Sequence, residues 1–299
     1  ESKRIPIKLL VAASLFSFFK KDEQEETPEQ KLVMTIKRSI LCIQREDYDT
    51  AEKMLHLALK MAQDLQNKDG ITYVYDVMAN LAMQREQFAK AERLFVDVMK
   101  RLFADGHEED SDKMLHISAK IAHMAQIQGN TEKALQGFKW TLEKIESKMK
   151  NLKENEALKE LWGLTKNWYG QLLMDLEKYA EAKCCFLEAY EAFKEIHGKI
   201  NSEAIMLLNN LSVACANLND IQGAKEFLEE ALELAKELPE LIETGVLKAN
   251  LGLLYLKQGL LQQAKDACSL AWRLGTKMKS EEAVSQADYC LKMINEFDK

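Results

Sequence analysis

The stretch ANLAMQREQFAKAERLFVDV, residues 79–98, decides the fold. It contains two apolar segments with helical spacing on either side of a polar turn, Arg85-Glu86-Gln87. Ala79 and Ala91 are both small and lie twelve residues apart, and the bulky Phe95 follows Ala91 by four residues. Where two antiparallel helices cross closely, small residues allow the backbones to approach and a bulky neighbour fills the remaining space. The stretch therefore predicts a helical hairpin.

The same spacing occurs six times, and the first Ala of the second helix recurs at intervals of 40, 43, 48, 42 and 40 residues. Each copy is expected to form two antiparallel helices. The pattern predicts an all-α chain of about six long repeats between residues 30 and 275. The six triplets of small residue, Ala and following residue are Ser39, Ala51 and Leu55; Ala79, Ala91 and Phe95; Ala122, Ala134 and Phe138; Gly170, Ala182 and Phe186; Ser212, Ala224 and Leu228; and Gly252, Ala264 and Cys268.

Both ends of the repeat region carry helix signals. Thr27-Pro28-Glu29-Gln30 combines an N-cap Thr, a Pro at the first helical position and a Gln three residues after the cap. At the other end, residues 280–297 carry an apolar stripe with helical spacing, which is typical of the capping helix that a repeat array needs. The sequence thus predicts one continuous repeat domain over residues 27–299.

The first 26 residues differ from the rest and are predicted to form a membrane anchor followed by an acidic linker. Residues 9–19 are apolar except for two serines, which favours insertion into lipid over binding at its surface. A helix from Arg4 to Lys20 would be about 25 Å long, so it would span a bilayer if flanking lysines reach the interface. We therefore expect one short transmembrane helix that contacts lipid through residues 5–19. A cleavable signal remnant and a helix packed on the repeats are the alternatives.

Composition and motifs argue against several functions. The net charge of −7 disfavours nucleic acid as a partner. Phosphate-binding loops and the helical zinc motif HExxH are absent from the sequence, so we expect neither an enzyme nor a cofactor, metal or small-molecule substrate. The six cysteines show no paired or zinc-type spacing and are predicted to be free thiols packed mostly in the core.

Function is then expected on the concave face, which the first helix of each repeat lines. Polar uncharged residues lie near the middle of this face, where amide groups could pair with the backbone of an extended peptide. The alternative is that neighbouring helices of the protein itself fill some of these positions. The candidate groove residues are Tyr73, Asn80, His116, His123, Asn167, Gln171 and Asn209.

The repeated pattern of small, Ala and bulky residues resembles the tetratricopeptide repeat over residues 30–275. This resemblance implies a right-handed α-α superhelix. The usual tetratricopeptide period is 34 residues, and the longer period here is closer to that of kinesin light chains. The period therefore leaves open a peptide-binding cargo adaptor of the kinesin-light-chain type.

A narrower resemblance rests on the apolar segment ending Leu15-Phe16-Ser17-Phe18-Phe19 together with two repeat motifs, residues 46–52 and 85–92. These features resemble the mitochondrial tetratricopeptide repeat protein 19 family over essentially the whole chain. The resemblance implies a single-pass protein of the mitochondrial inner membrane that binds respiratory complex III. It further implies a non-enzymatic role in turnover of the Rieske iron-sulfur protein, through clearance of its N-terminal fragments.

Overall fold

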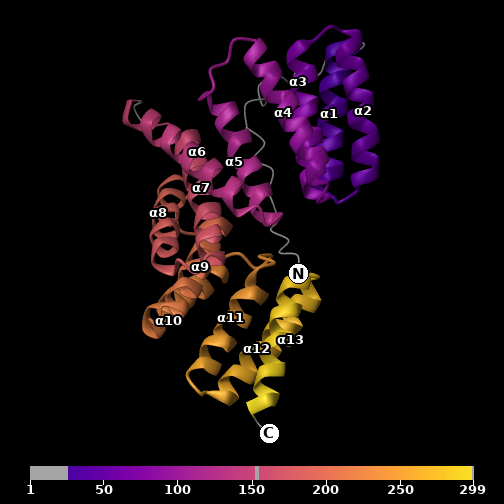
Figure 1. Cartoon of the computed structure of the whole chain (residues 1–299). Coiled ribbons are helices and arrows are strands. Elements are labelled where there is room, and N and C mark those ends of the chain that lie inside the picture. The colour runs from indigo at the N-terminus through magenta and orange to yellow at the C-terminus, as the bar shows by residue number, and fades with distance from the viewer. Residues whose placement is uncertain (1–25, 152–154, 298–299) are drawn as a thin grey trace. The chain divides into compact units, whose positions relative to one another are not determined.

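The computed structural model describes residues 26–151 and 155–297, and in these ranges every regular element is a helix (Figure 1). The helices follow the order that the repeat pattern predicts, two for each of the six repeats, and one more helix follows them. The helices are α1 (Pro28–Gln44), α2 (Tyr48–Asp64), α3 (Lys68–Gln84), α4 (Phe88–Ala104), α5 (Asp112–Ile127), α6 (Thr131–Asn151), α7 (Glu156–Asp175), α8 (Tyr179–His197), α9 (Ser202–Asn217), α10 (Ile221–Ala235), α11 (Thr244–Lys257), α12 (Leu261–Met278) and α13 (Glu281–Phe297).

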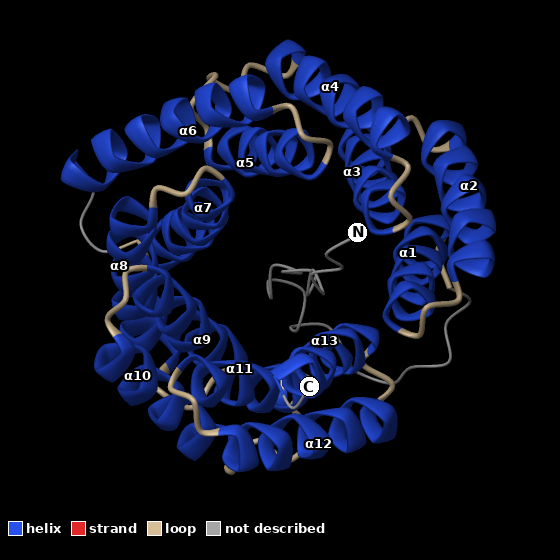
Figure 2. Cartoon of the chain, turned by 60° about the horizontal axis from the view of Figure 1, so that its bottom comes forward, coloured by secondary structure: helices blue, strands red, loops and turns tan. Residues whose placement is uncertain are grey.

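The described residues fall into two compact units, which meet within the last turn of α5. The first unit covers residues 26–124. In it, α1 and α3 lie side by side, with α2 and α4 packed behind them (Figure 2). The second unit covers residues 125–297. There α7, α9 and α11 form one layer, and α8, α10 and α12 form the layer behind it. Each unit therefore has one face made by the first helices of its repeats.

The predicted crossing residues lie where the helices meet. All six repeat Ala residues are fully buried, and so are the six small residues that precede them by twelve positions. At the fourth crossing, a Cβ added to Gly170 would lie 2.6 Å from Cε1 of Phe186, which is too close for a larger side chain. The predicted start of α1 is also confirmed, because Thr27 and Gln30 form a reciprocal capping box.

The turns inside the hairpins share one backbone feature. Glu46, Glu86, Glu177 and Asn219 have positive φ angles, and Gly129 and Gly259 occupy the equivalent place in the third and sixth repeats. A residue in this conformation ends a helix sharply and reverses the chain. The polar turn Arg85-Glu86-Gln87 noted in the sequence is therefore a helix C-terminal turn.

The prediction that all six cysteines are free thiols is wrong. Cys268 of α12 and Cys290 of α13 form a disulfide, and Cys42, Cys184, Cys185 and Cys215 are free. Cys268 occupies the position that is Leu or Phe in the other five repeats, so the repeat pattern alone explains its burial. Cys290 lies on the buried side of α13, and packing of α13 against α12 brings the two Cα atoms to 6.3 Å.

The predicted capping helix is confirmed as α13, which packs on α11 and α12. The predicted membrane anchor at residues 5–19 lies outside the described residues. Among the residues that the structure does describe, no helix has both the length and the apolar character needed to cross a membrane.

Candidate functional site

The structure places the seven predicted groove residues on the first helices of their repeats, but with very different exposure. Asn80, His123 and Asn209 are buried, with 7%, 1% and 4% of their surfaces exposed. Tyr73 is 41% exposed. The remaining three, His116, Asn167 and Gln171, are half-buried. The candidates that a ligand could reach are therefore Tyr73 and His116 in the first unit and Asn167 and Gln171 in the second.

In the first unit, polar side chains of α3 and α5 form a connected cluster. The Asn80 amide donates to the Asp76 carboxylate at 3.2 Å and to the Asp76 backbone oxygen at 2.7 Å. The ammonium of Lys120 donates to the Asn80 side-chain oxygen at 2.8 Å. Asp76 also interacts electrostatically with Tyr73 and with His116. We call these five residues, Tyr73, Asp76, Asn80, His116 and Lys120, the α3–α5 cluster.

Burial and neighbouring charges shift the pKa of two residues of the cluster, His116 and Tyr73. Burial lowers the pKa of His116 to about 4, and the positive charge of Lys120 acts in the same direction. Asp76 and Asp112 oppose this shift without cancelling it. Burial also raises the pKa of Tyr73, with a smaller contribution from the Asp76 charge. At neutral pH the cluster therefore presents a neutral imidazole and a neutral phenol beside one anion and one cation.

In the second unit, amide side chains link the first helices of successive repeats. Asn210 of α9 donates to Asn167 of α7 at 3.1 Å, and Asn250 of α11 donates to the buried Asn209 of α9 at 2.7 Å. Gln171 donates to the same Asn167 oxygen at 3.5 Å. These contacts bear out the alternative that neighbouring helices fill part of the predicted groove. We call Asn167, Asn209, Asn210 and Asn250 the amide ladder.

Sequence reasoning missed the donor in each contact that joins successive repeats. Lys120, Asn210 and Asn250 each lie two residues before the small crossing residue of their helix, at Ala122, Ser212 and Gly252. Each of these side chains points toward the preceding repeat. The acceptor there lies either one residue after the crossing residue of its own helix, as Asn80 does, or three residues before it, as Asn167 and Asn209 do. A polar residue two positions before the crossing residue was the signal that could have identified them.

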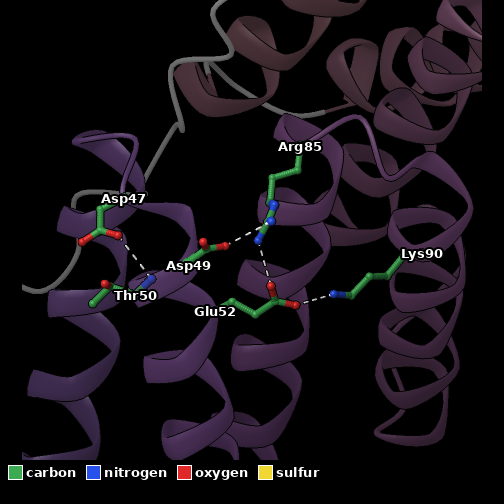
Figure 3. A network of polar contacts seen from close by, with 6 residues as sticks. All are labelled: Asp47, Asp49, Thr50, Glu52, Arg85 and Lys90. Carbon is green, nitrogen blue, oxygen red and sulfur yellow. Dashed lines mark hydrogen bonds and ion pairs between the residues drawn. The ribbon is translucent and has the colours of Figure 1, made fainter.

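A separate ion-pair network joins the first two repeats (Figure 3). Glu52 of α2 accepts from Arg85 at 2.8 Å and from Lys90 at 2.5 Å, and Arg85 also reaches Asp49 at 3.2 Å. The hydrogen bond from Lys90 lowers the pKa of Glu52, partly against the effect of burial. Because α2, the turn after α3 and the first turn of α4 supply these groups, the network links one repeat to the next and forms no part of the α3–α5 cluster.

The face of the first unit combines polar groups with an aromatic ring. The α3–α5 cluster offers hydrogen-bond donors and acceptors beside an exposed aromatic ring, which suits the backbone and side chains of a bound peptide. Within the described ranges, no three His, Cys, Asp or Glu side chains are placed to hold a metal ion.

Comparisons with known proteins place the chain in a family. The model of the tetratricopeptide repeat matches residues 163–237. Among solved structures, the crystal structure of BtubC (BKLC) from P. vanneervenii has a similar fold, with a TM-score of 0.61 and 21% identity. That match covers 86% of this chain and 94% of the other.

Two curated relatives are more informative. The chain is 59% identical to the mitochondrial tetratricopeptide repeat protein 19 homolog of Drosophila melanogaster, across 91% of this chain and 74% of that protein. It is 28% identical to the mitochondrial tetratricopeptide repeat protein 19 of Rattus norvegicus, across 88% of this chain and 74% of that protein. The chain therefore belongs to the mitochondrial tetratricopeptide repeat protein 19 family.

Proposed function

We propose that the chain is a non-enzymatic protein-interaction factor of mitochondria and that it binds respiratory complex III. Membership of a family whose curated relatives are mitochondrial carries this proposal. In this role it supports turnover of the Rieske iron-sulfur protein by helping to clear its N-terminal fragments. The protein is anchored in the inner membrane by residues 5–19, and the repeats present the binding face.

The geometry of the first unit supports a peptide-binding role. The exposed ring of Tyr73 lies beside the charged groups of the α3–α5 cluster, and half-buried His116 is neutral at physiological pH. An extended segment of a partner could pack on the ring and pair its backbone with the polar groups. We assign Tyr73 the largest contribution, because aromatic side chains dominate the energetics of such contacts.

Affinity capture from detergent-solubilised mitochondria tests the proposal. The full chain should recover complex III subunits together with fragments of the Rieske protein, and the Tyr73→Ala variant should recover at least tenfold less. Leu57→Ala is the matched control, since Leu57 is 54% exposed in the same unit but on α2. Capture by the unmodified chain without complex III or Rieske fragments would refute the proposal. Equal recovery by both variants would remove the α3–α5 cluster from it.

The cargo-adaptor alternative has the support of the fold alone. It rested on the length of the repeat, which the fold explains through longer helices such as α6 and α7.

A further inference from the structure

The last helix of the repeat array is held in a way that the other helices are not. Helix α13 ends the array and packs on α11 and α12. Its outward-facing Tyr289 is 58% exposed. A terminal helix of a repeat protein has neighbours on one side only, so it opens locally more readily than the internal repeats do.

The contacts beneath α13 are close and apolar. Ala249 of α11, Ala271 of α12 and Ala287 of α13 pack together and are fully buried. A Cβ added to Gly245 would lie 2.7 Å from the Ala283 methyl group, and one added to Gly275 would lie 2.9 Å from Val284. These small residues let α13 settle deeply, but each contributes little apolar area. Larger side chains, including Leu256 of α11 and Ile294 of α13, form a second apolar cluster with the two cysteines.

The disulfide lies in the second of these clusters. In five repeats the residue four positions after the crossing Ala is Leu or Phe, whereas in the sixth it is Cys268, bonded to Cys290 of α13. The fit depends on Gly252 of α11, where an added Cβ would lie only 2.1 Å from Sγ of Cys268. A covalent bond to the cap thus replaces the bulky side chain of the other repeats.

We propose that the Cys268–Cys290 disulfide is a redox-controlled lock on the cap helix. While the bond is intact, α13 cannot leave α12, because the two cysteines close a loop with a sequence separation of 22. Once the bond is reduced, the whole of α13 can open and expose the small-residue face of α11 and α12. Loop closure of this size restricts opening by about a hundredfold.

The redox step balances with a dithiol as reductant. One thiolate of the dithiol attacks a cysteine sulfur, and its second thiolate then attacks the mixed disulfide. The dithiol becomes a disulfide, and Cys268 and Cys290 take up the two electrons and two protons as thiols. Both sulfur-bearing residues are fully buried, so the attack requires prior opening at the edge of α13. The disulfide is therefore reduced under sustained reducing conditions, whereas brief exposure to a reductant leaves it intact.

Counting thiols tests the bond itself. Denatured, unreduced protein treated with N-ethylmaleimide should carry four labels, one for each free cysteine, and prior reduction should raise the number to six. Six labels without reduction would overturn the proposal.

Hydrogen exchange of the full folded chain tests the lock. Reduction should speed amide exchange in α13 by about a hundredfold and leave α8 to α10 within about twofold. The unreduced Cys290→Ala variant should match the reduced protein, and Cys184→Ala, which removes an exposed free thiol, should match the oxidised one. Equal exchange of α13 in oxidised and reduced wild type would refute the lock. That measurement remains decisive if the Cys290→Ala variant does not fold.

Discussion

The α3–α5 cluster and the amide ladder occupy the same face of their respective repeats but are built from different chemistry. In both, a side chain two residues before the crossing residue donates to the preceding helix. In the first unit the donor is the cation Lys120, and it lies near the titratable groups Asp76 and His116. In the second unit, donor and acceptor are neutral amides.

The difference separates a face with charged and titratable groups from one whose polar groups are paired neutral amides. Neutral amides that satisfy each other hold adjacent helices in register and leave few groups for a ligand. Charged and titratable groups beside an exposed ring can respond to a partner or to pH. The first unit should therefore be sensitive to pH on this face, whereas the same face of the second unit should be sensitive to packing and to loss of amide pairing.

The largest expected loss of stability comes from disturbing the close contact between Gly170 and Phe186 in the second unit. Gly170→Leu places side-chain atoms inside the volume of the Phe186 ring and should lower the free energy of unfolding by about 3 kcal/mol. Urea unfolding measures the loss. Ala180→Leu, at an exposed site of α8, is the control and should change stability by less than about 0.5 kcal/mol. An unchanged midpoint for Gly170→Leu would show that the helix crossing is wrongly placed.

A smaller effect should follow from breaking the amide ladder. Asn250→Ala leaves the buried oxygen of Asn209 without this donor and should cost about 2 kcal/mol. The double variant with Asn209→Ala should cost less than the sum of the single changes, since each removes the same contact. Asn295→Ala, at an exposed position of α13, serves as control. Strict additivity would mean that the ladder contributes no pairing energy.

The smallest effect concerns pH and the first unit. Because the folded state lowers the pKa of His116 to about 4, from an ordinary value of 6.5, it binds fewer protons than the unfolded state between these values. Stability is thus complete above the ordinary pKa and falls as pH decreases toward 4. Between about pH 7 and pH 5 the loss attributable to His116 should be about 1 to 2 kcal/mol.

The His116→Gln variant isolates this contribution, since it should lose about 1 to 2 kcal/mol less than wild type over the same interval. His56→Gln, at an exposed site of α2, should follow wild type. If wild type and His116→Gln lose the same free energy of unfolding between pH 7 and pH 5, the pKa of His116 is not lowered by folding.

The repeat architecture could be predicted because steric demands at a helix crossing restrict residue size at fixed spacing. The same buried pair of positions recurs in different repeats, for example as Ala91 and Phe95 and as Ala182 and Phe186. The capping box at Thr27 is similarly local, since its two hydrogen bonds join residues three apart. Such features depend on neighbours along the chain, so the sequence reveals them directly.

Features that depend on contacts between repeats were harder to predict from the sequence. The disulfide escaped prediction because Cys268 fits the repeat pattern as a buried residue and its partner Cys290 lies in a helix outside the pattern. The pairing of the candidate groove residues escaped prediction for a related reason. The spacing placed Asn80 and Asn209 on the right face, but only packing of adjacent helices shows that Lys120 and Asn250 already pair with them.

The disulfide between α12 and α13 also determines whether α13 is released when a protease cuts the chain between the two helices. Lys279, in the connection between these helices, is exposed and has a positive φ angle. A cut after this residue would divide the chain in two, yet the C-terminal piece would stay attached through Cys290. A nicked molecule would migrate as one species on a non-reducing gel and as two on a reducing gel. Cleavage and loss of the cap are thus separate events in this protein.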